Sequence, residues 1–133
     1  MKVQILRVDR DYVPLPLADG PGEVRAVVWP GMQARHRSMH YVALPVGART
    51  VPQRHAASEA VYYVIRGQGQ VEDLDAGSSH AVGPGSVVFI TPQNRYRIAA
   101  APHSELICIG GPCPPDPALY AGAHPSEGQN ESR

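Results

Sequence analysis

The chain has 133 residues, enough for one domain, and 43% of them are hydrophobic, which suffices for a single core. Twelve lysine and arginine residues balance twelve aspartate and glutamate residues, which argues against a protein that binds polyanions through excess positive charge. The 13 glycines and 14 prolines exclude a protein of long helices, because proline breaks helices and glycine weakens them. Two cysteines, Cys108 and Cys113, are too few for a disulfide framework or a four-cysteine zinc site.

No apolar run in the sequence reaches the length needed to cross a membrane. Residues 1–4 lack the basic and then apolar pattern of a secretion signal. We therefore expect a cytoplasmic protein that interacts with neither a membrane nor a nucleic acid. The sequence shows no internal repeat, so residues 1–121 are expected to form one domain. Residues 122–133 are small and polar and are predicted to be a disordered tail.

Short apolar runs follow one another along the chain, separated by turns rich in glycine and proline. In chain order, these runs cover residues 3–8, 24–29, 39–44, 61–65, 68–73, 87–91, 96–99 and 105–109. Several of them alternate apolar and polar residues, as strands with one buried face do. A spacing of about ten residues between short strands is typical of a β sandwich or barrel. The sequence therefore predicts an all-β domain, with a helical turn tolerated only around residues 117–121.

The segment from Gly47 to Gly67 carries a spaced set of polar residues. Five residues separate Gly47 from Gln53, His55 follows two positions later, and Glu59 comes after three more residues. This spacing resembles the first motif of the cupin family, whose members are jelly-roll barrels (double-stranded β helices) that often hold one divalent metal in the barrel mouth. The resemblance implies a single cupin barrel. Two positions depart from the motif: Gln53 replaces its first histidine, and seven residues instead of six separate Glu59 from Gly67.

The extra residue before Gly67 leaves two interpretations open. Either it forms a β-bulge that re-aims Glu59, or Ala60 occupies the ligand position and Glu59 faces away. The second motif of the family is matched at Gly85, whereas Tyr96 stands where the histidine that completes the metal site belongs. Its remaining positions are occupied by Thr91, Gln93 and Ala100.

Residues 59–62 and 67–75 resemble ectoine synthase, a cupin that closes a ring by eliminating water with a metal held by glutamate, tyrosine and histidine. Only the glutamate carries over, to Glu59. The tyrosine falls near Val88, and the histidine falls on Tyr96. The resemblance therefore implies a related enzyme with a different substrate.

The predicted catalytic residues are His55, Glu59 and Tyr96, and the same three with Gln53 form the predicted metal site. His55 either binds a first-row metal, for which neutral imidazole is a good ligand, or contacts the substrate directly. Glu59 either binds the metal or acts as a general base, unless it is a surface carboxylate. Tyr96 is a ligand, an acid or a lining residue, and Gln53 binds the metal or the substrate. The implied metal is iron, zinc, manganese or nickel.

The predicted substrate-binding residues are Gln53, Tyr63, Arg97 and His40. Tyr62 and Tyr63 alternate along a strand, so only one of them faces inward. His40 lies in a basic run that either receives an anionic group or is a solvated loop. Arginines outnumber lysines by 11 to 1, and several of them border the predicted barrel mouth. Because arginine binds carboxylate and phosphate bidentately, we expect a small anionic substrate.

Three functions remain open at this point. The first is a biosynthetic lyase or cyclase of the dehydratase kind that uses a divalent metal as a Lewis acid. The second is a metal-free isomerase or cyclase in the same cavity, with Glu59 or His55 as base and Tyr96 as acid. The third is a module that binds a small ligand without catalysis. The resemblance to cupins also implies a homodimer in which residues 3–8 pack on the sheet of a neighbour.

Overall fold

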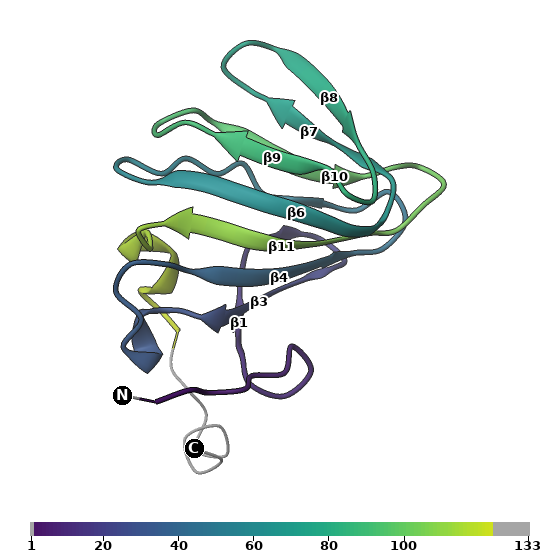
Figure 1. The fold of residues 1–133 in the computed structure, drawn as a ribbon. Helices are drawn as coiled ribbons and strands as arrows, with labels where there is room; N and C mark the ends of the chain where they lie inside the picture. The colour runs from purple at the N-terminus through teal and green to yellow at the C-terminus, as the bar shows by residue number, and fades with distance from the viewer. Residues whose placement is uncertain (1, 124–133) are drawn as a thin grey trace.

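The computed structural model describes residues 2–123, which form two antiparallel β sheets that face each other (Figure 1). The order of the six-stranded sheet is β1 (Val13–Leu15), β3 (Glu23–Val28), β4 (Met39–Leu44), β11 (Leu106–Cys113), β6 (Glu59–Gly67) and β9 (Val87–Ile90). The order of the five-stranded sheet is β2 (Ala18–Asp19), β5 (Arg49–Thr50), β10 (Tyr96–Ala100), β7 (Gly69–Asp73) and β8 (Ser78–Val82). The predicted all-β class is confirmed.

Two short 3-10 helices complete the described part of the chain. The first is η1 (Pro30–Met32), and the second, η2 (Pro117–Tyr120), is the helical turn that the sequence predicts. Neither helix within residues 2–123 has the length or the apolar character needed to cross a membrane. Residues 124–133 of the predicted tail lie outside the described residues.

Strand β6 shows how the sequence pattern builds the interior. Its side chains alternate between exposed and buried, because neighbouring residues of a strand point to opposite faces. Ala60, Tyr62 and Val64 face the opposite sheet and are at most 2% exposed, whereas Val61 and Tyr63 point outward and are 40% and 48% exposed. The inward side chains of both sheets form one hydrophobic core, whose burial drives folding.

The extra residue before Gly67 is accommodated by a β-bulge at the far end of β6. Strand β11 skips Ile65, because its residues pair with Val64 and with Arg66 on either side. The bulge lies well beyond Glu59 and leaves that residue exposed on the outer face. The structure therefore agrees with the second interpretation, in which Ala60 takes the inward position and Glu59 faces away, because the bulge does not re-aim Glu59.

The chain passes from the six-stranded sheet to the five-stranded sheet at Gly67. This residue has φ = 92°, in the left-handed region that favours glycine. A Cβ atom here would clash with the backbone carbonyl of Glu105. Glycine is therefore required for the crossover that places β6 and β7 on opposite sides of the core.

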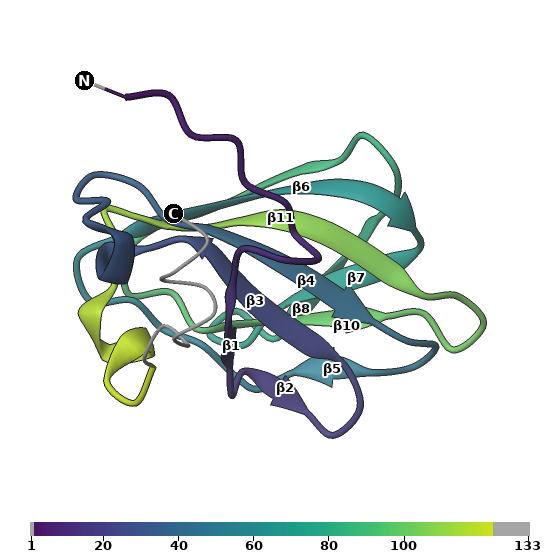
Figure 2. The ribbon, with the colours of Figure 1, turned by 90° about the horizontal axis from the view of Figure 1, so that it is seen from below.

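The predicted first strand, residues 3–8, is wrong as a strand. Residues 2–7 pair with neither sheet and lead away from the body of the fold (Figures 1 and 2). Val3 and Ile5 are each 80% exposed. A lone extended segment gains no ladder hydrogen bonds and buries no apolar face, which is why the apolar pattern alone does not make a strand here.

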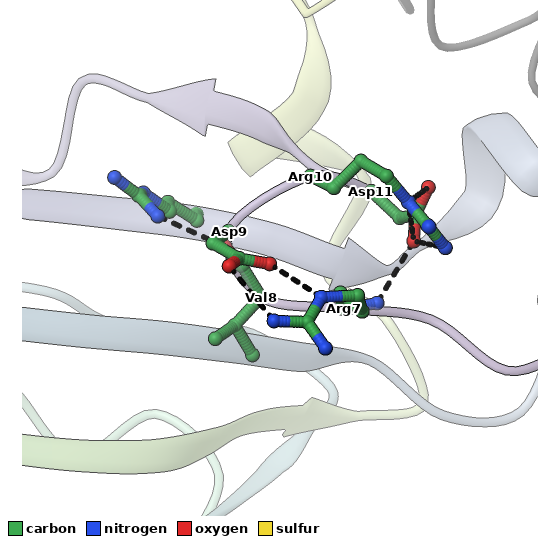
Figure 3. Close-up of polar contacts among 6 residues, drawn as sticks. Arg7, Val8, Asp9, Arg10 and Asp11 are labelled. Atoms are coloured by element: carbon green, nitrogen blue, oxygen red, sulfur yellow. Dashed lines mark hydrogen bonds and ion pairs between the residues drawn. The ribbon is translucent and has the colours of Figure 1, made fainter.

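The turn that follows this segment is tied to the sheet by polar contacts (Figure 3). The Arg7 side chain pairs with Asp9 at 3.0 Å, and the Arg7 backbone N–H donates to the carboxylate of Asp11 at 2.8 Å. The Arg25 guanidinium on β3 donates to the carbonyl of Val8 at 2.9 Å. Exposed ion pairs contribute little by themselves, but the contact with β3 sets where the N-terminal segment leaves the sheet.

The segment after β11 folds back over one end of the barrel, where Figures 1 and 2 show it in yellow. The Ser58 hydroxyl donates to the carbonyl of Pro114 at 2.7 Å. Tyr120, at the end of η2, is 8% exposed, and its ring centroid lies 5.7 Å from that of Trp29. This end of the core is therefore closed by the chain itself.

His40 on β4 is buried beneath this segment and is 1% exposed. Its Nε2 atom lies 2.6 Å from the hydroxyl of Tyr120. Burial, with a smaller contribution from the nearby charge of His55, lowers the pKa of His40 from its ordinary value of 6.5 to about 4. The His40 imidazole is therefore neutral in the folded protein at neutral pH.

Replacement of His40 tests this closure through the pH dependence of stability. The unfolded chain protonates this histidine near pH 6.5, whereas the folded chain resists protonation until about pH 4, so the stability due to His40 is lost as the pH falls through that window. We expect a loss of about 2 kcal/mol between pH 7 and pH 5 from this group. Urea unfolding of the protein and of a His40→Gln variant, which keeps a group that can bond to Tyr120, measures the difference. Equal pH slopes for the two proteins would contradict the assignment.

Candidate active site

A buried hydrogen-bond chain connects both sheets and the C-terminal segment. The Nδ1 atom of His55 lies 2.7 Å from the carboxylate of Asp116, and the Nε2 atom of His55 lies 2.7 Å from the hydroxyl of Tyr96. The Tyr96 hydroxyl in turn lies 2.8 Å from that of Tyr62. His55 follows β5, Tyr96 begins β10, Tyr62 lies in β6, and Asp116 is the N-cap of η2. His55, Tyr96 and Tyr62 are each at most 2% exposed.

The carboxylate of Asp116 sets the direction of this chain. A carboxylate accepts hydrogen bonds, so His55 donates from Nδ1–H to Asp116. In a neutral His55, the Nε2 atom then accepts the hydrogen bond that the Tyr96 hydroxyl donates. The Tyr96 oxygen keeps lone pairs that accept from the Tyr62 hydroxyl. Protons therefore point from Tyr62 through Tyr96 and His55 toward Asp116.

Burial keeps the two phenols in their neutral form. Desolvation raises the pKa of Tyr96 well above its usual value of 10, and the neighbouring Tyr62 raises it further. Desolvation also raises the pKa of Tyr62, with the hydrogen bond to Tyr96 acting in the opposite direction. Both hydroxyls are therefore proton donors at neutral pH.

Gln53 lies beside Tyr96 and has an unsatisfied acceptor. The two residues form an isolated β-bridge, in which the Gln53 N–H donates to the Tyr96 carbonyl at 2.8 Å and the Tyr96 N–H donates to the Gln53 carbonyl at 3.0 Å. Gln53 is 7% exposed, and its Oε1 atom is the buried side-chain atom without a hydrogen-bond partner among residues 2–123. A buried carbonyl oxygen without a partner is costly, so this atom is suited to accept a bond from a ligand.

A cavity of about 560 Å³ opens between β8 and β9, which are the outermost strands of the two sheets on the same side of the barrel. Its apolar lining includes Val71 and Val82 from one sheet and Val88 and Ile90 from the other, and polar side chains line the rest of the cavity. Tyr96 also lines the cavity, so the hydrogen-bond chain meets it at this residue. A cavity of this size accommodates a drug-sized molecule.

The structure does not bring Glu59 to His55, and the expectation that the two meet inside the sheet is wrong. Glu59 is exposed on the outer face, where it lies opposite Cys113 of β11. The inward position is taken by Ala60, which is 0% exposed. Six residues separate Ala60 from Gly67, which is the spacing of the cupin motif. The methyl group of Ala60 therefore stands where the family places a ligand carboxylate.

None of the four predicted substrate-binding residues lines the cavity, although Gln53 lies beside Tyr96, which does. Tyr63 is 48% exposed on the outer face, and Tyr62 is the tyrosine of the pair that faces inward. Arg97 lies on the outer face of the five-stranded sheet, where it pairs with Glu72 at 3.0 Å. His40 is inside the barrel but bonds to Tyr120 instead of lining the cavity. The structure thus groups His55, Tyr96 and Gln53 and separates the other predicted residues from them.

Sequence reasoning missed Tyr62 and Asp116. The alternation of β6 indicates that one tyrosine of the pair faces inward, but only the register shows that it is Tyr62. Asp116 stands before Pro117, a pattern typical of the start of a helix. It does cap η2, since its side chain accepts from the backbone of Ala118, but no local pattern predicts its contact with a residue 61 positions away.

The donor set in the barrel does not fit the divalent metal that the family often carries. Such a metal needs several imidazole, carboxylate or thiolate donors around one point. Within the described range, 2–123, no group of three histidine, cysteine, aspartate or glutamate side chains is arranged to hold an ion. Both nitrogens of His55 are hydrogen-bonded, and the raised pKa of Tyr96 disfavours the phenolate form that binds metals. Ala60 supplies no donor atom.

Two curated proteins share part of this sequence. L-ectoine synthase from Teredinibacter turnerae is 28% identical over 96 residues, which cover 71% of this chain and 67% of that protein. The uncharacterised protein MJ1618 from Methanocaldococcus jannaschii is 24% identical over 97 residues, which cover 72% and 76% of the two chains.

Solved structures share the fold. The polyketide cyclase RemF from Streptomyces resistomycificus superposes with a TM-score of 0.68 at 21% identity, covering 98% of this chain and 97% of RemF. A predicted oxalate decarboxylase from Thermotoga maritima gives a TM-score of 0.69 at 18% identity, covering 83% and 98%. The family model described as Cupin domain matches residues 40–109, which is more than half of the sequence. The chain therefore belongs to the cupin family.

Proposed function

We propose that this cupin is a small-molecule enzyme, a cyclase or lyase that moves protons in its cavity without a divalent metal. The observation that carries the proposal is the hydrogen-bond chain from Asp116 through His55 to Tyr96, a residue that lines the cavity. Tyrosine and histidine positioned in this way serve as general acid and base. The names of L-ectoine synthase and the polyketide cyclase RemF support a ring-closing reaction.

Tyr96 is the residue of the hydrogen-bond chain that touches the substrate. Its oxygen takes a proton from the carbon next to a substrate carbonyl while its own proton passes to Nε2 of His55. The carboxylate of Asp116 stabilises the imidazolium through Nδ1–H, as carboxylates beside catalytic histidines do. Tyr62 donates to the Tyr96 oxygen and stabilises negative charge that develops on it.

The proton returns to the substrate by the reverse path. Delivered to a leaving hydroxyl, it completes the elimination of water. Delivered to a carbonyl oxygen that the new carbon nucleophile attacks, it completes ring closure. The valine and isoleucine side chains of the cavity contact the apolar part of the substrate.

The two other functions left open by the sequence make different demands on the site. Metal-dependent chemistry needs a donor set that the described residues do not gather. A module that only binds ligand needs the cavity but no chain of proton donors behind it. The buried chain and the absence of a carboxylate at position 60 therefore favour metal-free proton transfer.

We also propose that the protein is a homodimer, because two apolar surfaces of the chain lack a cover. The outer face of β6 and β9 presents exposed side chains that pair across the strands, Val61 opposite Phe89 and Tyr63 opposite Val87. Monomers rarely expose a contiguous apolar patch. The exposed N-terminal segment supplies a second such surface, and a two-fold arrangement lets each copy cover the outer face of the other.

Replacing the residues of the hydrogen-bond chain tests the proposed catalysis. We expect the protein to exchange deuterium into the carbon beside the carbonyl of neutral ketones such as α-tetralone, followed by proton NMR in D₂O. Tyr96→Phe and His55→Gln remove the proton path and should slow exchange by about 100-fold or more. Asp116→Asn should also slow it, because the amide no longer enforces the Nδ1–H tautomer.

Two controls separate this mechanism from its alternatives. Glu59→Gln changes an exposed carboxylate outside the barrel and should leave the rate unchanged. Dialysis against a chelator should also have no effect. Exchange that chelation abolishes and a divalent metal restores would overturn the proposal, as would full activity in Tyr96→Phe. Binding of the ketones without exchange would favour the ligand-binding module.

Light scattering tests the dimer. The protein should have twice the mass of one chain at micromolar concentration. Tyr63→Glu, or deletion of residues 2–6, should give a monomer because each removes one of the two apolar surfaces. Ser79→Glu places the same charge on an exposed strand of the other sheet and should leave the dimer intact. A monomeric parent protein, or a dimer unaffected by both changes, would rule out this arrangement.

A further inference from the structure

The cavity between β8 and β9 has an uneven distribution of charge. Two ionisable side chains besides Tyr96 line it, Asp73 and His80, and no lysine or arginine among residues 2–123 does so. Asp73 and His80 belong to the five-stranded sheet, whereas the opposite wall, with Val88 and Ile90, carries no ionisable side chain. An anionic group that entered this cavity would meet a carboxylate and no guanidinium.

Asp73 is held in its ionised form by the turn that follows it. One of its carboxylate oxygens accepts from the backbone N–H of Ala76 at 2.9 Å, from that of Asp75 at 3.1 Å, and from the side chain of Asn94 at 3.0 Å. These bonds, led by the one from Ala76, lower the pKa of Asp73 below its ordinary range. Asp73 therefore places a carboxylate at this wall of the cavity.

The arginines that suggest an anionic substrate in the sequence are used elsewhere. Four of them are engaged with carboxylates on the outer surfaces. These ion pairs are Arg25 with Glu23, Arg49 with Asp19, Arg66 with Glu105 and Arg97 with Glu72. The excess of arginine over lysine thus says nothing about the ligand of the cavity.

We infer that the cavity selects a neutral, largely apolar molecule of two or three rings and rejects anions of the same shape. The apolar walls supply the affinity, and the carboxylate of Asp73 at the rim disfavours negative charge on the ligand. The inference rests on the proposed function and deepens it by naming the substrate class of the same cavity, which differs from the anionic substrate that the sequence led us to expect.

Two fluorescent probes of nearly identical shape test this selection. N-phenyl-1-naphthylamine is neutral, and 8-anilinonaphthalene-1-sulfonate is the same molecule with an added sulfonate. We expect the neutral probe to bind at least about ten-fold more tightly. Asp73→Asn, which keeps the acceptor oxygen for the turn, should narrow this difference by improving the binding of the sulfonate.

Variants that fill the cavity locate the probe. Val88→Trp and Thr91→Trp place a large ring at an inward wall and at an exposed rim position, so one of them remains usable if the other fails to fold. Each should abolish binding of the neutral probe. Val61→Thr changes the apolar outer face of β6 and should leave binding of the neutral probe unchanged. That result would exclude binding of the probe on the outer face.

The inference is wrong if the sulfonate binds as tightly as the neutral probe and the cavity-filling variants lose binding of both probes. It is also wrong if the cavity-filling variants bind the neutral probe as the parent protein does. These outcomes are distinct from failure of the proposed function. If the protein binds the neutral probe selectively but exchanges no deuterium, the proposed enzymatic function is wrong and the inferred ligand class stands. If it exchanges deuterium into ketones but prefers the sulfonate, the proposed function stands and the inferred ligand class is wrong.

Discussion

The hydrogen-bond chain from Asp116 through His55 and Tyr96 to Tyr62 is the interaction on which the site depends. Buried imidazole and hydroxyl groups must find partners, and each one left unsatisfied costs about 1–3 kcal/mol. Because the four residues come from η2, the segment after β5, β10 and β6, satisfying them joins the C-terminal segment to both sheets. The same bonds give the chain its direction, with the carboxylate at one end and the cavity near the other.

Ala60 decides which chemistry this barrel can support. A carboxylate at that inward position would stand with His55 as a second metal donor, whereas a methyl group leaves the imidazole to bond with Tyr96 and Asp116. Burial keeps the phenols of Tyr62 and Tyr96 protonated. The interior is therefore suited to proton transfer on an uncharged molecule.

The fold follows from the sequence because its signals are local: alternating strands, glycine turns and the spacing around Gly47, His55 and Gly67. The inward position of His55 and Tyr96 follows from the same motifs. The direction of Glu59 does not, because a bulge six residues later shifts the register, and a one-residue shift moves every side chain to the other face. The contact of Asp116 with His55 could not be predicted from the sequence, because the two residues are 61 positions apart and meet only where the segment after β11 folds back over the barrel. The excess of arginine suggests an anionic ligand from the sequence alone. In the structure, Arg49, Arg66 and Arg97 instead pair with carboxylates on the outer surface.

Nitrogen NMR of histidine-labelled protein tests the central claim most directly, because it reports which ring nitrogen of His55 carries the proton. Above pH 8 we expect the Nδ1–H tautomer, with a slowly exchanging proton shared with Asp116, and no change on addition of one equivalent of zinc. The His40 signals are identified by their loss in His40→Gln. An Nε2–H tautomer, or a metal-induced shift of the His55 resonances, would contradict the proposed metal-free proton path.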